Sequence, residues 1–211
     1  ERIEIALRTQ IIYQNSLKHG SHFFQRKSLY HNRLNFEKDL KTVDKEIQRS
    51  SEVFIKHYKL KYTAPKRPPA WMSLEILSLG TLSKLFENLR ISPEKKAIAT
   101  HFGINAFVLE SWMHTLSHVR NICAHHGRLW NRTLTQIPKL PKKTSFKWIS
   151  NAAISSDRLY ATLCCIQYLL NTVAPNHTFH TRLKNLLMEY PKTDLMSMDF
   201  PLGWEKEAFW Q

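Results

Sequence analysis

The sequence predicts an all-α protein, with one domain over residues 1–211 built as a bundle of about six to eight helices joined by basic loops. Apolar residues recur at alternating steps of three and four along most of the chain, which is the spacing of a helix with one buried face. Hydrophobic residues make up 43% of the 211 residues, enough for a packed core. Only 5 glycines and few alternating apolar runs disfavour strands.

Two helices and a linker are predicted before residue 70. Residues 1–19 form the first helix, which Gly20 closes. A longer helix spans residues 36–58, where apolar residues recur at helical spacing and lysines, arginines and acids occupy the other face. We interpret that face as solvated, with a contact to RNA as the alternative. Prolines between Lys59 and Pro69 exclude a helix, so this basic segment is the clearest linker.

Helix is predicted to resume over residues 71–89. Ser92-Pro93 then has the composition of a helix start, with serine as N-cap and proline in the first turn. That short helix is expected to end near Gly103 and to lead directly into the helix that contains the candidate site.

Three elements are predicted in the last third of the chain. Pro138 to Lys143 forms a second basic loop broken by prolines. Residues 157–171 are very apolar and are expected to form a buried helix, and residues 179–190 form another. The aromatic tail over residues 199–210 is expected to pack back on the bundle.

The helix between Asn105 and Gly127 presents two different faces. Asn105 is its expected N-cap and Gly127 its expected C′ residue. An apolar stripe is expected to face the core: Leu109, Trp112, Leu116, Val119 and Cys123. A second stripe is polar, and three of its four members titrate near neutral pH: His114, His118, Asn121 and His125.

The formal net charge of +14 indicates a polyanionic partner, most simply nucleic acid. An anionic membrane surface is a less simple partner, and a solvated basic surface without one is the alternative. The three cysteines lack C-x-x-C spacing, so we expect them in the core of a cytoplasmic protein. No signal peptide or membrane span is predicted. Because the sequence begins on a glutamate inside a helical pattern, we expect that the beginning of the natural chain is missing.

Arg120, Asn121 and His125 form the candidate catalytic set. Asn121 and His125 are one helical turn apart, and the long Arg120 side chain can reach the same face. A guanidinium group binds phosphate bidentately, and an imidazole exchanges a proton at neutral pH. For RNA the ribose 2′-OH supplies the nucleophile, so neither metal nor cofactor is expected. A symmetric dimer would supply two such sets across its twofold axis. The alternative is a structural role for each residue.

Several neighbouring residues are candidates for RNA contact. His126 is expected to assist His125 or to cap the helix, and Trp130 to stack on a base or to pack in a core or interface. For His114 and His118 we favour structural or dimer-interface roles, and without a third ligand we do not expect zinc. The RNA-binding candidates are His126, Arg128, Arg132, Lys66, Arg67, Lys142 and Lys143, with helix capping as the alternative for Arg128 and Arg132.

Residues 120–125 resemble the R-N-x-x-x-H signature of the HEPN superfamily of metal-independent ribonucleases. The wider string over residues 119–132 is similar to the Abi-like (abortive infection, AbiD/AbiF) phage-defence family, and so are residues 2–10, 68–75 and 79–85. The resemblance runs in order over nearly the whole chain. Family members usually have a further segment before the first helix.

The resemblance implies a HEPN fold, a homodimer with facing motif helices, and RNA cleavage that leaves 2′,3′-cyclic phosphate ends. It makes Arg120 and His125 the catalytic pair and Asn121 the residue that orients them. Some members associate with a small noncoding RNA. In another HEPN branch a nucleotidyltransferase modifies a tyrosine two positions after the histidine, and Gly127 at that position disfavours such a partner.

These observations together predict a metal-independent endoribonuclease that acts as an abortive-infection or toxin effector. RNA and a second copy of the chain are the expected partners, with a small noncoding RNA or an antitoxin left open. The alternative is a non-catalytic RNA-binding protein of a ribonucleoprotein, which would use the same positive charge without cleaving RNA.

Overall fold

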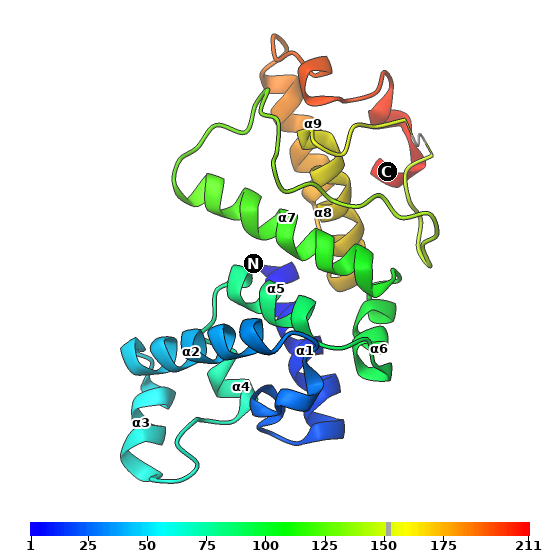
Figure 1. Cartoon of the computed structure of the whole chain (residues 1–211). Coiled ribbons are helices and arrows are strands. Elements are labelled where there is room, and N and C mark those ends of the chain that lie inside the picture. The colour runs from blue at the N-terminus through cyan, green and yellow to red at the C-terminus, as the bar shows by residue number, and fades with distance from the viewer. Residues whose placement is uncertain (151–152) are drawn as a thin grey trace. The chain divides into compact units, whose positions relative to one another are not determined.

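The computed structural model describes residues 1–150 and 153–211, and within them it contains helices and no strand (Figure 1). The predicted all-α class is confirmed. Nine α-helices are described: α1 Arg2–His19, α2 Arg33–Arg49, α3 Val53–Lys61, α4 Ala70–Ser73, α5 Leu79–Asn88, α6 Pro93–His101, α7 Ala106–Ala124, α8 Leu159–Val173 and α9 Phe179–Glu189. No helix among these residues is both long and apolar enough to cross a membrane.

Two predicted helices are each divided in the structure, which corrects the expected number. The predicted helix over residues 36–58 separates into α2 and α3, because the backbone turns extended at Ser50 and its hydroxyl accepts the N–H of Glu52 at 3.3 Å. The predicted helix over residues 71–89 separates into α4 and α5, because Ser78 starts a new helix and accepts the N–H of Thr81 at 3.2 Å.

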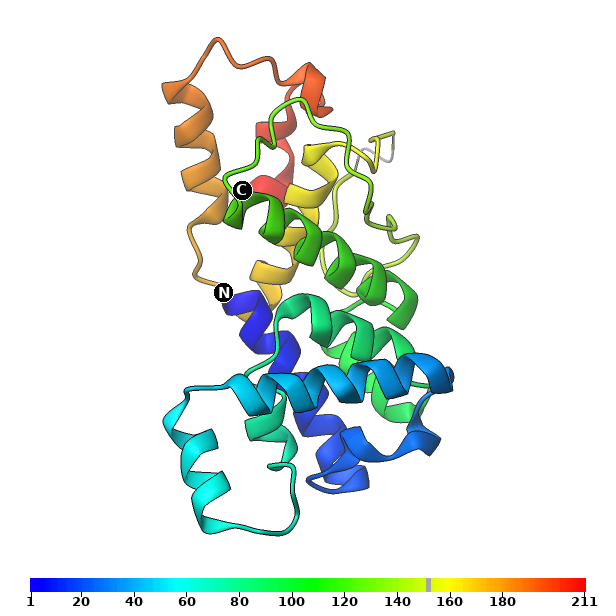
Figure 2. The same ribbon diagram turned by 60° about the vertical axis from the view of Figure 1, so that its left-hand side comes forward.

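The described chain forms two compact units, one over residues 4–101 and the other over residues 1–3 and 102–211. In the first unit α2 packs along α5, and the two helices lie side by side in Figures 1 and 2. Asn32 caps α2, and its Oδ1 accepts the N–H of Asn35 at 3.0 Å. The core of this unit is formed by apolar side chains of several helices, among them Leu7, Ile11, Phe36, Val43, Leu82 and Phe86.

The first unit also buries a charged side chain. Lys95 in α6 is 2% exposed, and its Nζ donates to the carbonyl oxygens of Glu87 and Leu89 at 2.9 and 2.6 Å. Those carbonyls belong to the C-terminal end of α5, where the helix has no intrahelical donors for them. Lys95 therefore caps one helix from another. The predicted start of α6 is confirmed, because Ser92 Oγ accepts the N–H of Lys95 at 3.1 Å.

The segment before α4 is held in place. α3 continues to Lys61, so the irregular segment begins three residues later than the predicted linker. The Tyr58 hydroxyl donates to the carbonyl oxygen of Pro65 at 2.7 Å. Prolines exclude a helix here, as expected, and hydrogen bonds from neighbouring elements fix the path of the loop.

The second unit is organised around α7 and α8, which pack together. The predicted N-cap of α7 is confirmed, because Asn105 Oδ1 accepts the N–H of Val108 at 3.0 Å. The rings of Trp112 and Trp148 stack at 5.5 Å, and Tyr168 meets Trp112 edge-on at 5.4 Å. Such aromatic contacts fix α7 and α8 against each other.

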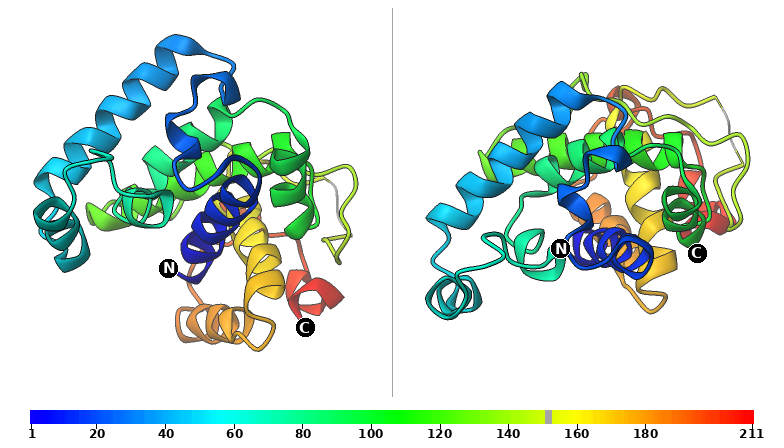
Figure 3. Two further views of the ribbon diagram at one scale, coloured as in Figure 1. Left: turned by 90° about the horizontal axis from the view of Figure 1, so that it is seen from below. Right: turned by 60° about the horizontal axis from the view of Figure 1, so that its bottom comes forward.

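The C-terminal tail packs back on this unit, as the sequence predicts. Trp210 is buried, and its Nε1 donates to the Tyr160 hydroxyl of α8 at 3.0 Å. α9 lies next to α8 in both views of Figure 3. Unlike α8, α9 has no buried side chain, although the predicted apolar stripe is present.

Candidate functional site

The C-terminal end of α7 adopts a Schellman motif. The N–H of Gly127 donates to the carbonyl oxygen of Ile122 at 2.7 Å, and the N–H of His126 to that of Cys123 at 3.0 Å. His126 has φ +56, so it is the left-handed C′ residue. The expectation that Gly127 occupies C′ was wrong by one position, and the capping role considered for His126 is the one its backbone adopts.

Gly127 is required for space rather than for its backbone angle. A Cβ atom at this position would lie 2.8 Å from Cγ2 of Ile122 and 3.0 Å from its carbonyl oxygen. The chain therefore leaves α7 in close contact with its last turn. This contact fixes the turn that contains Asn121 and His125.

The candidate catalytic side chains of Arg120, Asn121 and His125 are all exposed. The last two are joined through the helix, because the N–H of His125 donates to the carbonyl oxygen of Asn121 at 3.1 Å. Farther back along the same face, His114 and His118 are half-buried. The helix thus presents a guanidinium, an amide and an imidazole group to solvent.

The apolar stripe of α7 ends differently from the prediction. Cys123 is exposed, and Ile122 occupies the buried position instead. The next buried residue after Val119 is three positions farther along rather than four. Both spacings are compatible with a helix of 3.6 residues per turn. Ile122 and Val119 pack with Leu134, so the core face and the polar face meet at residue 123.

The segment after α7 folds back against it. Leu129 packs on the cluster of Val119, Ile122 and Leu134. The Thr135 hydroxyl and Nε2 of His118 are hydrogen-bonded at 3.4 Å, which gives that histidine a structural contact. The segment between residues 128 and 135 is thereby held beside the motif.

Two predicted RNA contacts lie in this returning segment. Arg128 and Arg132 are exposed, and Arg132 Nη1 donates to the carbonyl oxygen of Arg128 at 3.5 Å. The guanidinium carbon of Arg128 lies 5.7 Å from the ring centre of Trp130, a cation–π distance. With His126, they add basic groups on the chain that follows His125.

The remaining predicted RNA contacts are divided between the units. Lys142 and Lys143 are exposed in the same unit as the motif, whereas Lys66 and Arg67 belong to the other unit. Arg67 donates to both carboxylate oxygens of Asp44, at 2.6 and 2.8 Å. That hydrogen bond raises the pKa of Arg67, and an RNA phosphate would have to compete with Asp44.

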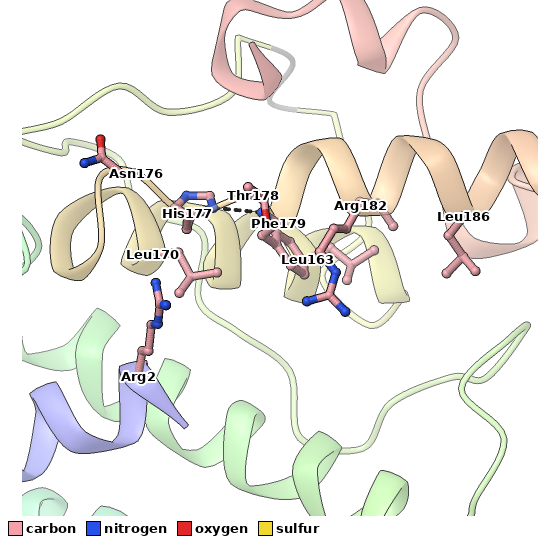
Figure 4. Close-up of a pocket in the computed structure, with 10 residues that line it drawn as sticks. Arg2, Leu163, Leu170, Asn176, His177, Thr178, Phe179, Arg182 and Leu186 are labelled. Carbon is pink, nitrogen blue, oxygen red and sulfur yellow. Dashed lines mark hydrogen bonds between the residues drawn. The ribbon is translucent and has the colours of Figure 1, made fainter.

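A groove of about 790 Å³ lies between α8 and α9 (Figure 4). Figure 4 shows Arg2 extending from the first turn of α1 toward Leu170. The lining contains one histidine, His177, but its Nδ1 accepts the N–H of Phe179 at 3.0 Å and its Nε2 is hydrogen-bonded to Asn171 Oδ1 at 2.7 Å. Burial lowers the pKa of His177, with help from His180 and Arg2. Since both ring nitrogens are engaged, we assign no proton transfer to this groove.

A second cleft, of about 460 Å³, lies beside Trp130 and was missed in the sequence. Its other lining residues are at the end of α9 and just after it: Glu189, Tyr190, Pro191, Lys192 and Thr193. The two sides are 59 to 63 positions apart in the sequence, so no local pattern would have joined them. Among residues 1–150 and 153–211, no group of three or more histidines, cysteines or acids is placed to hold a metal ion.

Fold and site together define an all-α protein that presents an arginine, an asparagine and a histidine at the exposed end of a helix. The chain matches the family model described as Abi-like protein over residues 1–131, which includes all of α7 and the R-N-x-x-x-H stretch. It belongs to this Abi-like family, and membership implies a role in abortive infection. No curated protein and no solved structure matches the chain.

Proposed function

We propose that this protein is a metal-independent endoribonuclease that acts as the toxic effector of an abortive-infection system. The main support is the exposed set of Arg120, Asn121 and His125 on α7 of an Abi-like protein. Exposure is required because the substrate is a polymer that must reach the helix from solvent. The charge of +14 suits a polyanion, and His126, Arg128, Arg132, Lys142 and Lys143 add basic groups in the same unit.

The proposed reaction is a transesterification within one strand of RNA. The ribose 2′-OH attacks the adjacent phosphorus, the bond from phosphorus to the 5′-oxygen breaks, and a 2′,3′-cyclic phosphate forms. One imidazole accepts the proton of the 2′-OH, and another protonates the leaving oxygen. Arg120 offsets the negative charge that grows on the phosphate oxygens. Asn121, one turn before His125, orients the imidazole or the ribose.

A second copy of the chain would complete this site. One α7 offers one His125, whereas the reaction uses a base and an acid. Two α7 helices related by a twofold axis supply both. A small noncoding RNA or an antitoxin would then act by covering this surface until infection.

The test is incubation of purified protein with total RNA in buffer containing EDTA, followed by mapping of new ends. We expect cyclic-phosphate ends from the wild type, and a loss of about 10²–10⁴-fold for Arg120→Ala and for His125→Ala. Arg33→Ala and His57→Ala, which remove exposed residues of the same types in the other unit, are matched controls. Cleavage by either motif variant at the wild-type rate, or strict dependence on Mg²⁺, would contradict the proposal.

The positive charge also favours a second candidate, a non-catalytic RNA-binding protein. Both candidates predict salt-sensitive binding, with log K falling by about 0.7 per phosphate contact for each log unit of salt on single strands. End chemistry separates them, because only the nuclease generates cyclic-phosphate ends that disappear in His125→Ala.

A further inference from the structure

The cleft beside Trp130 brings together two exposed aromatic side chains from distant parts of the sequence. Trp130 is 41% exposed and Tyr190 is 56% exposed, and both line the same hollow. Single exposed aromatic side chains are ordinary, but two that line one open cleft from distant parts of the sequence form a surface on which a flat group can stack. A volume of about 460 Å³ is within the usual range for small-molecule sites.

The two sides of the cleft are held in position. On one side, Leu129 is packed on the α7 cluster, and Asn131 Oδ1 accepts a hydrogen bond from Arg158 Nη1 at 3.4 Å. Trp130 is therefore fixed between two anchored neighbours. On the other side, the N–H of Tyr190 donates to the carbonyl oxygen of Leu186 at 3.2 Å. The carbonyl oxygen of Tyr190 accepts the N–H of Thr193 at 3.0 Å. Neither backbone segment has to be reorganised before a ligand binds.

The polar groups around the cleft match a nucleotide. The Arg128 guanidinium lies over the Trp130 ring, and Lys192 is part of the lining. A base gains affinity by stacking on an aromatic side chain, and nearby cations attract its phosphate. Glu189, also in the lining, is an acceptor for the exocyclic amino group of cytosine, adenine or guanine. Uracil has no such group.

We propose that this cleft is a nucleobase subsite, which holds one base of a single-stranded RNA and favours a base with an exocyclic amino group over uracil. The subsite rests on the proposed function, because it takes RNA as the ligand. Trp130 follows His125 by five residues, a span of at most about 18 Å. The bound base is therefore within a few nucleotides of the linkage that is cleaved, and it sets which linkages are chosen.

The test measures binding without cleavage. Fluorescein-labelled oligocytidine and oligouridine six-mers are titrated with His125→Ala protein, and fluorescence anisotropy gives Kd. We expect Trp130→Ala and Tyr190→Ala to weaken oligocytidine binding by about 5- to 100-fold each. Trp130→Phe should retain most of the affinity. Glu189→Gln should reduce the preference for oligocytidine over oligouridine. Trp71→Ala, which removes an exposed tryptophan of the other unit, is the matched control and should bind normally.

Unchanged oligocytidine binding by folded Trp130→Ala would overturn the subsite. So would a change in self-association or in protein binding with no change in oligonucleotide binding, since the cleft would then be a protein interface. These outcomes can be distinguished from a failure of the proposed nuclease function. If the wild type cleaves RNA and Trp130→Ala binds oligocytidine normally, the subsite proposal is refuted and the nuclease proposal is not. If oligocytidine binding depends on Trp130 but the wild type does not cleave RNA, the nuclease proposal is refuted and the subsite proposal is not.

Discussion

The close contact between Gly127 and the last turn of α7 allows a quantitative test of the site's support. In Gly127→Ala the new methyl group would lie 2.8 Å from Ile122 Cγ2 and 3.0 Å from the Ile122 carbonyl oxygen. Relief requires the buried Ile122 side chain to move, or the hydrogen bond from Gly127 to Ile122 to lengthen. Overpacking costs about 1–3 kcal/mol, and a lost hydrogen bond about 0.5–1.5 kcal/mol. The reduced entropy of the unfolded chain returns about 0.4–1 kcal/mol.

We therefore expect Gly127→Ala to lower the free energy of unfolding by about 1–3 kcal/mol, measured by urea denaturation with circular dichroism. Ile122→Leu moves the branch point away from Cβ and removes Cγ2. In that background Gly127→Ala should cost less, although the contact with the carbonyl oxygen remains. Gly203→Ala is the control. Its φ of +73 makes the substitution strained, but a Cβ atom at this position would have no neighbouring side chain or backbone atom within 4 Å. The cost of Gly203→Ala should therefore not depend on residue 122.

Equal costs of Gly127→Ala in the wild-type protein and in the Ile122→Leu background would refute the steric argument. The same variant also reports on function. Because the strain falls on the turn that contains His125, we expect RNA cleavage by folded Gly127→Ala to drop, while Gly203→Ala cleaves at the wild-type rate.

Two further predictions concern the unit over residues 4–101. Burial raises the pKa of the Asp39 carboxyl to about 6, with Lys84 acting to lower this pKa and Glu87 to raise it. The folded state therefore holds the Asp39 proton more tightly than the unfolded chain does. As a result, the free energy of unfolding falls as pH rises from about 4 to about 6. Asp39→Asn should remove that dependence and stabilise the protein at pH 7 by about 1–2 kcal/mol, a value reduced because the group is only half-buried. Urea denaturation midpoints are measured at pH 5 and pH 7. A variant whose midpoint shifts between these pH values as much as that of the wild type would contradict the prediction. Lys95→Met leaves the buried carbonyl group of Leu89 and the part-buried one of Glu87 without their capping donor and should cost about 2–4 kcal/mol. The exposed Lys96→Met should cost less than about 0.5 kcal/mol. Comparable losses in the two variants would show that the cap contributes little.

The sequence predicted best what depends on a few neighbouring residues. The caps of α6 and α7 were located because a serine or asparagine side chain satisfies the N–H group three residues ahead, whatever the rest of the chain does. The break at Ser50 was missed because apolar spacing continues across it, while the local hydrogen bonds of a serine compete with the helix.

Features that depend on three-dimensional packing were harder to predict. Cys123 and Ile122 are adjacent, and Ile122 is the one that packs with Val119, Leu129 and Leu134, two of which follow α7 and lie outside the helical pattern. The three catalytic candidates were found in the sequence because Asn121 and His125 are one helical turn apart and Arg120 lies next to their face. Tyr190 had no local signal, since it joins Trp130 only when α9 lies beside the segment that follows α7.

The single accessible thiol offers a practical route to the quaternary structure. Cys164 and Cys165 are buried, and burial raises the pKa of both thiols, so a maleimide reagent will react with Cys123 alone. A nitroxide attached there without mutagenesis sits between Asn121 and His125. Pulsed electron paramagnetic resonance on this native cysteine then yields the separation between two copies of α7, should they meet about a twofold axis.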